Sequence, residues 1–215
     1  MRGLWIIIVL LAIASVISTY GWLTKEPAII EERTQLNTQI EGLQAQIQSY
    51  QTDNEAQIKY IEFMLKGLQS YYTAAHNYGY AEADYDNAGI FYDESYFSDA
   101  KIFADSCDMY YGHSSSYYSD AKALFDRAKG YATTNKIRVL AELHVNLSEY
   151  NYRIVNEMHE ACEYFSSACD SYDKGYWDTA DNQIDMMNEH IEEHDNLVPQ
   201  QNEYWSKIDA LLEDL

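Results

Sequence analysis

The apolar side chains of this chain begin as one unbroken run near the N-terminus. From Leu4 to Leu23 no residue is charged. Twenty helical residues span about 30 Å, which is the thickness of the apolar core of a bilayer. Aromatic residues suited to the two membrane interfaces lie near the ends of the run, at Trp5, Tyr20 and Trp22. We therefore predict that Leu4–Leu23 is a transmembrane helix.

The residues that flank this run indicate an orientation, although weakly. Arg2 precedes it, and both Lys25 and Glu26 follow it. We expect a single-pass signal-anchor protein with a cytoplasmic tail at 1–3, a membrane helix at 4–23 and an extracytoplasmic remainder. Two alternatives involve processing: a signal peptide cleaved after the A-x-A pattern at Ala12–Ala14, or a pilin-like leader cut after Gly3.

A heptad pattern follows in residues 27–76, which we call the stalk. Apolar residues recur at alternating spacings of three and four, with Ile at the a positions, Leu at the d positions and Asn54 at one a position. This combination is typical of a parallel two-stranded coiled coil, in which the Asn fixes the register. The alternative is that the seam packs on helices of the same chain. The predicted seam comprises Leu36, Ile40, Leu43, Ile47 and Asn54.

Beyond Ile58 the apolar face of the stalk widens, and the pattern of residues 77–215 is that of a globular helical domain. The widened face includes Phe63, Leu65 and Leu68, so we expect it to enter a core. The remaining helices are expected over roughly 81–111, from the serines at 114–116 to 132, 137–172 and from 177 to Pro199, with a short last helix around 204–212. Gly112 is expected to end the first of these. Long helices with short breaks predict an antiparallel helical bundle or stacked helical hairpins, so the fold class is all-α.

A weak internal repeat accompanies these helices. The segment Ser95–Lys101 recurs as Ser116–Lys122, a shift of 21 residues, and Gly175–Ala180 is related to both. We interpret this similarity as a pattern of close helix packing.

Composition supports the helical prediction and limits the choice of partners. The chain has only two Pro and nine Gly, so few residues break helices. Its formal net charge is −21, and a domain this acidic repels phosphate backbones. Nucleic acid is therefore excluded as an expected partner. The 21 Tyr against 6 Phe indicate either packing at the edge of a core or a tyrosine-rich recognition surface for a protein.

Three cysteines are present, at positions 107, 162 and 169. Cys162 and Cys169 are separated by about 10 Å of helical rise, which is too far for a disulfide. Cys107 can pair with either of them across two packed helices. We expect instead that all three are free and buried as small apolar residues.

The sequence offers one motif with metal chemistry. His190-Ile191-Glu192-Glu193-His194 fits H-x-x-E-H, and two imidazoles four residues apart on a helix can share a zinc ion. The match resembles inverted zinc proteases over these five residues only, and too little chain follows for the further carboxylate ligand. We therefore expect no catalysis and no cofactor, and retain His190 and His194 as a candidate metal pair.

The expected function follows from the anchor, the stalk and the lack of catalytic motifs. We expect a membrane-anchored extracytoplasmic scaffold or accessory subunit that acts through a protein partner or a homo-oligomer. The alternatives are a sensory or ligand-binding ectodomain, a self-assembling envelope component and, more remotely, a zinc-dependent hydrolase. Asn146, in an Asn-x-Ser pattern, is a candidate glycosylation site if it lies outside the cytoplasm.

Overall fold

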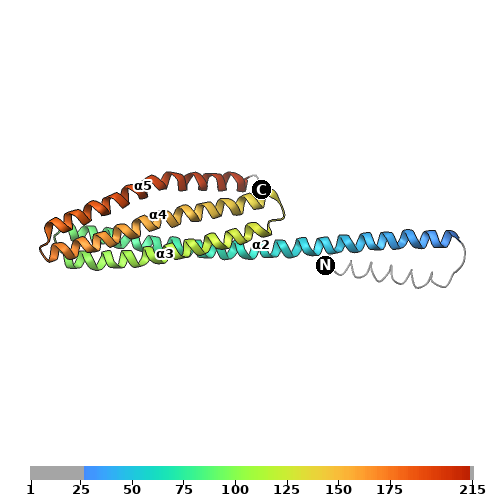
Figure 1. Ribbon diagram of the computed structural model, residues 1–215, viewed down its shortest axis with the longest axis horizontal. Helices are drawn as coiled ribbons and strands as arrows, with labels where there is room; N and C mark the ends of the chain where they lie inside the picture. The colour runs from blue at the N-terminus through green and yellow to red at the C-terminus, as the bar shows by residue number, and fades with distance from the viewer. Residues whose placement is uncertain (1–26, 214–215) are drawn as a thin grey trace. The chain divides into compact units, whose positions relative to one another are not determined.

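The computed structural model describes the backbone of residues 27–213 and the side chains from Thr34 onward. This part of the chain forms four helices and no strands: α2 (Pro27–Asp93), α3 (Phe97–Tyr131), α4 (Asn135–Asp173) and α5 (Trp177–Glu213) (Figure 1). The all-α prediction is confirmed. The predicted membrane helix Leu4–Leu23 lies outside the described residues. Among the helices that are described, none combines the length and the apolar character needed to cross a bilayer.

The chain divides into two units, residues 1–52 and 53–215. In the second unit, the C-terminal part of α2 packs with α3, α4 and α5 as neighbouring, roughly antiparallel helices (Figure 1). The bundle predicted from long helices and short breaks is thus confirmed. The break at 133–135 is also where it was predicted, and the Thr134 side chain caps α4 by accepting a hydrogen bond from the Ile137 N–H at 3.4 Å.

Small residues line most of the helix contacts inside the bundle, which lets the helix backbones approach closely. Gly67 is the closest approach: a Cβ atom at this position would lie 2.6 Å from the ring of Phe125 on α3. The space between such closely packed helices holds few large side chains. The fully buried alanines are Ala74, Ala81, Ala88, Ala100, Ala104, Ala121, Ala128, Ala141, Ala161, Ala168 and Ala180, and the largest fully buried side chains include Tyr111, Phe125, Leu147 and Ile208.

Adjacent tyrosines divide between the core and the surface of the bundle. Tyr71 is buried while its neighbour Tyr72 is exposed, and Tyr118 is buried while Tyr117 is exposed. The rings of Tyr71 and Tyr118 meet edge to face at 5.1 Å. Burial raises the pKa of both hydroxyls. The Tyr71 hydroxyl oxygen is satisfied by a hydrogen bond from Asn151 Nδ2 at 2.6 Å.

The turns α2–α3 and α4–α5 have the same backbone structure. Ser95 and Gly175 adopt left-handed φ values of 64° and 78°. In each turn the next residue donates a backbone hydrogen bond to the carbonyl five residues earlier, Tyr96 to Phe91 at 2.9 Å and Tyr176 to Ser171 at 2.8 Å. This is the Schellman pattern of a helix C-terminus.

The shared turn reveals that the bundle consists of two similar helical hairpins, α2–α3 and α4–α5. When Ser95 is matched to Gly175, several residues of the two hairpins are identical, and the matched alanines are all buried. The shift of 21 seen in the sequence does not relate structural equivalents, because Ser95 lies in a turn and Ser116 lies within α3. The identical pairs include Ala81 and Ala161, Ala88 and Ala168, Tyr92 and Tyr172, Asp93 and Asp173, Tyr96 and Tyr176, and Ala100 and Ala180.

Several predicted helix boundaries are wrong. Helix α2 continues through residue 81, where a new helix was expected, and α5 includes residues 204–212, which were expected to form a separate helix. Gly112 does not end a helix, because α3 continues from Phe97 to Tyr131, and the true break is at 94–96, where no glycine occurs. Pro199 lies inside α5. Pro199 and Asp195 are both exposed, so the Asp195 carbonyl, which loses its helical partner, lies on the side of the helix that faces water.

Candidate functional site

The stalk carries apolar residues that the bundle does not bury. No side chain from 34 to 59 is buried, and of the predicted seam Leu43 and Asn54 are exposed while Leu36, Ile40 and Ile47 are half-buried. The stalk joins the core from Tyr60 onward, where Tyr60, Met64, Tyr71 and Ala74 are buried.

The bundle part of α2 also has an outward apolar face. Ile58, Ile61 and Leu65 are 57%, 55% and 62% exposed. The prediction that Leu65 joins the core is wrong, whereas Phe63 and Leu68 do pack against it. Met64 and Tyr71 belong to the core cluster, and burying their side of α2 turns Leu65 towards solvent. We call Leu43, Ile47, Tyr50, Ile58, Ile61 and Leu65 the apolar stripe; with Asn54 they recur at spacings of three and four along one helix.

A disulfide links the two hairpins. Cys107 on α3 and Cys162 on α4 are bonded, with Cα atoms 6.3 Å apart. The expectation that all three cysteines are free is wrong for these two, because antiparallel packing brings both positions to the same level of the bundle. Cys169 is free and buried, and burial raises the pKa of its thiol to about 12.

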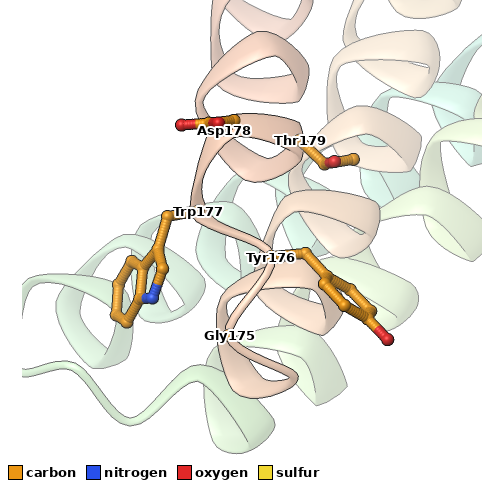
Figure 2. Close-up of a pocket in the computed structure, with 5 residues that line it drawn as sticks. All are labelled: Gly175, Tyr176, Trp177, Asp178 and Thr179. Carbon is orange, nitrogen blue, oxygen red and sulfur yellow. The ribbon is translucent and has the colours of Figure 1, made fainter.

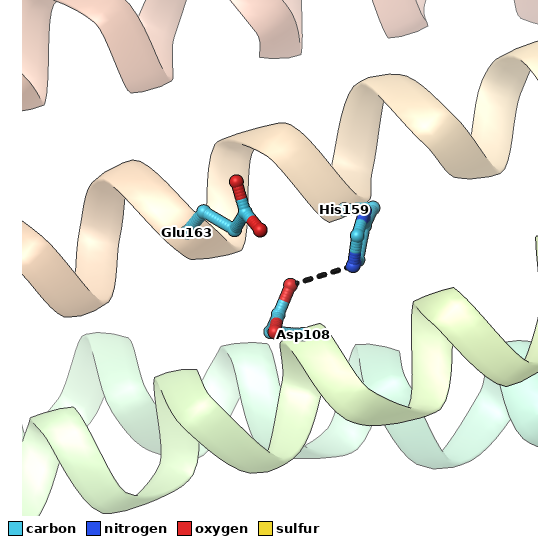
Figure 3. Close-up of side chains that lie close together, drawn as sticks. All are labelled: Asp108, His159 and Glu163. Carbon is cyan, nitrogen blue, oxygen red and sulfur yellow. Dashed lines mark ion pairs between the residues drawn. The ribbon is translucent and has the colours of Figure 1, made fainter.

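Next to the disulfide lies a group of possible metal ligands that the sequence did not reveal. Asp108 on α3 faces His159 and Glu163 on α4, and the three side chains converge between the two helices (Figure 3). One ligand atom from each lies within 4.8 Å of the others. His159 Nε2 is 2.8 Å from Asp108 Oδ1. We call these three residues the α3–α4 cluster. Its members are 51 or more residues apart across the two helices, so no local motif indicates it.

The α3–α4 cluster is electrostatically unbalanced. Burial raises the pKa of the Asp108 carboxyl, and the His159 imidazole opposes this change. Three further carboxylates, on Glu163, Asp105 and Glu160, raise the same pKa. Asp108 Oδ1 is buried and has no hydrogen-bond partner, although His159 Nε2 lies 2.8 Å away.

The two histidines of the H-x-x-E-H motif have separate partners in the structure. His190 Nδ1 lies 2.9 Å from a Glu157 carboxylate oxygen on α4, and its ring stacks on Tyr164. His194 Nδ1 lies 3.0 Å from its neighbour Asp195, and its Nε2 lies 3.3 Å from the Tyr78 hydroxyl. Glu193, the potential general base, is exposed.

The glycosylation pattern at Asn146 and a pocket at the α4–α5 turn offer little chemistry. Asn146 is half-buried in α4 and Ser148 of the same acceptor pattern is fully buried, so glycosylation would have to precede folding. An open pocket of about 330 Å³ lies at the α4–α5 turn and is lined by the five consecutive residues 175–179. Figure 2 shows the Tyr176 and Trp177 rings pointing in different directions, so this pocket presents no converging set of groups.

The described residues thus define an acidic all-α protein built from two disulfide-linked helical hairpins. Comparison with protein-family models, with curated proteins and with solved structures finds no match to this chain.

Proposed function

We propose that this protein is a membrane-anchored extracytoplasmic scaffold or accessory subunit that acts through its stalk, and that the apolar stripe pairs with a second copy of the same helix. The observation that supports this proposal best is the exposure of large apolar residues at helical spacing on α2, including Ile58, Ile61 and Leu65. Single exposed apolar residues are normal, whereas a periodic row of them is typical of a helix interface.

The heptad residues favour a second copy over an unrelated partner. Ile at a positions and Leu at d positions near the start of the stalk suit a parallel dimer, and Asn54 can pair with its own copy across the dimer axis. Parallel pairing also suits two chains anchored in one membrane by the same end.

The disulfide supports an extracytoplasmic location. Disulfides persist in oxidising compartments and are rare in the cytosol. A buried Cys107–Cys162 link therefore agrees with the side of the membrane that the flanking charges indicate for residues 27–215. The anchor itself is tested by carbonate extraction of membranes: the native chain should stay in the pellet, and release into the supernatant would contradict an anchored function.

The stripe is tested by measuring the mass of the full chain in detergent micelles. The wild type is expected to be a dimer, and the double variant Ile61→Asp/Leu65→Asp a monomer, because two carboxylates cannot be buried unpaired in the interface. Ile102→Asp is the matched control: Ile102 is 64% exposed on α3, outside the stripe, and its variant should remain dimeric.

Asn54→Leu provides a second test of the same interface. Removal of the polar residue relaxes the choice of register and oligomer number, so the variant should gain stability and form higher oligomers. A wild-type chain that is monomeric at all concentrations, or an unchanged mass for every stripe variant, would contradict the pairing proposal.

A further inference from the structure

We propose that the α3–α4 cluster, Asp108, His159 and Glu163, is a binding site for one divalent transition-metal ion such as Zn²⁺. The site differs from the H-x-x-E-H motif and does not depend on the function proposed for the stalk.

The ligand set has the chemistry that such an ion prefers. One imidazole nitrogen and two carboxylate oxygens are a mixed N/O set, which suits Zn²⁺ and its neighbours in the first transition row. Mg²⁺ and Ca²⁺ prefer oxygen ligands only. Three protein ligands leave further coordination positions for water.

The three side chains need to move little to bind one ion. Ligand atoms on one tetrahedral Zn²⁺ lie about 3.5 Å apart when each is at roughly 2.0–2.2 Å from the ion. In the cluster, His159 Nε2 and Asp108 Oδ1 are 2.8 Å apart, and all three ligand atoms lie within 4.8 Å of one another. Beside the ring is Gly112, where a Cβ atom would lie 3.4 Å from His159 Nε2, so the absent side chain leaves space next to the donor nitrogen.

The surrounding structure fixes this geometry in advance. The disulfide joins Cys107, which precedes Asp108, to Cys162, which precedes Glu163. It holds α3 and α4 at a constant separation beside the cluster. A rigid frame lowers the entropy cost of bringing ligands together, and is a condition for a precise metal site.

An ion would also relieve a charge imbalance that the protein leaves in place. Asp108 Oδ1 is buried without a hydrogen bond, and Glu160 and Glu163 add negative charge beside it. The nearby Lys101 pairs with Asp105 at 2.6 Å. The Asp108 and His159 side chains are each 31% exposed and Glu163 is exposed, so an ion can enter from solvent.

Calorimetric titration of the full chain with Zn²⁺ in detergent micelles tests the site. We expect one ion per chain for the wild type, and a Kd at least tenfold weaker for His159→Gln and for Glu163→Gln. The Glu163 variant keeps the His159–Asp108 pair, so it separates loss of a ligand from loss of that pair. Bound Co²⁺ should show visible absorption typical of one nitrogen ligand with oxygen ligands.

The matched control is His190→Gln/His194→Gln, which removes the other candidate pair and should leave the Kd unchanged. Thermal unfolding without metal checks that each variant is folded. The proposal is overturned if the wild type shows no saturable binding, if Mg²⁺ binds as tightly as Zn²⁺, if both cluster variants bind normally, or if binding disappears only in the control.

Discussion

At the scale of single residues, the most unusual group in the core is the imidazole of His144. It is only 8% exposed, and its ring stacks on Phe125 with centroids 4.8 Å apart. Burial lowers its pKa to about 4, because the charged form loses its hydration. His144 is therefore neutral in the folded protein at pH values where it is protonated in the unfolded chain.

This depressed pKa predicts a loss of stability in acid. Between pH 6.5 and about 4 the unfolded chain binds a proton that the folded chain excludes, so the free energy of unfolding falls as pH falls. The contribution of His144 should decrease by about 2 kcal/mol between pH 7 and pH 4.5. Urea unfolding of the wild type and of His144→Gln at both pH values measures it, since the variant lacks this dependence.

The exposed His113 on α3 provides the control for this measurement. His113→Gln should not reproduce the pH-dependent difference, because His113 is exposed and lies outside the core. Equal stability differences between the wild type and His144→Gln at pH 7 and pH 4.5 would show that His144 does not titrate as the buried site requires.

Single-residue patterns in this sequence predict some side-chain environments but not the contacts between helices. The tyrosine content of the sequence left edge packing and a recognition surface as alternatives, and the structure buries one ring of the pairs Tyr71-Tyr72 and Tyr117-Tyr118 while it exposes the other. The pairing of Cys107 with Cys162, and the meeting of Asp108 with His159 and Glu163, depend on which levels of α3 and α4 face each other. That alignment is set by the connection between α3 and α4 and by the packing of the whole bundle, and no local spacing encodes it.

At the scale of elements, the turns decide where the helices end. Thr134 was predictable because a threonine before a periodic segment is a good N-cap. The α2–α3 turn was missed because Ser95 adopts a left-handed φ of 64° that glycine would normally provide. Gly112 and Pro199 suggested ends that packing overrides, since both helices continue to bury apolar residues beyond them, such as Phe125 and Ile208.

The two equivalent turns predict opposite effects of exchanging their residues. Ser95→Gly should stabilise the protein by up to about 1 kcal/mol, because a side chain in the left-handed region costs about that much. Gly175→Ser should destabilise it by about 1 kcal/mol for the same reason. Thermal unfolding of the two single variants measures both effects. Shifts of the same sign would contradict the equivalence of the turns.

At the scale of the whole molecule, the bundle consists of two hairpins with matching turns and matching buried alanines, joined by the short connection between α3 and α4. Each hairpin alone exposes one face of small residues and aromatic rings. The core forms when the two faces meet. Between the hairpins, the ring centroids of Tyr85 and Phe165 are 5.8 Å apart. Because the two faces must meet to form the core, a covalent link between α3 and α4 is expected to stabilise the entire fold.

The Cys107–Cys162 disulfide is therefore predicted to be a major source of stability. It closes a loop over a sequence separation of 55, and the chain-entropy model gives about 4 kcal/mol for a loop of that size. Urea unfolding of the wild type with and without a reductant should show a difference approaching this value. Cys169→Ala should keep the difference, because Cys169 is free, whereas Cys107→Ala/Cys162→Ala should abolish it. A reductant effect that persists in the double variant would mean that this disulfide does not stabilise the bundle, and would also remove the structural support for an oxidising, extracytoplasmic location.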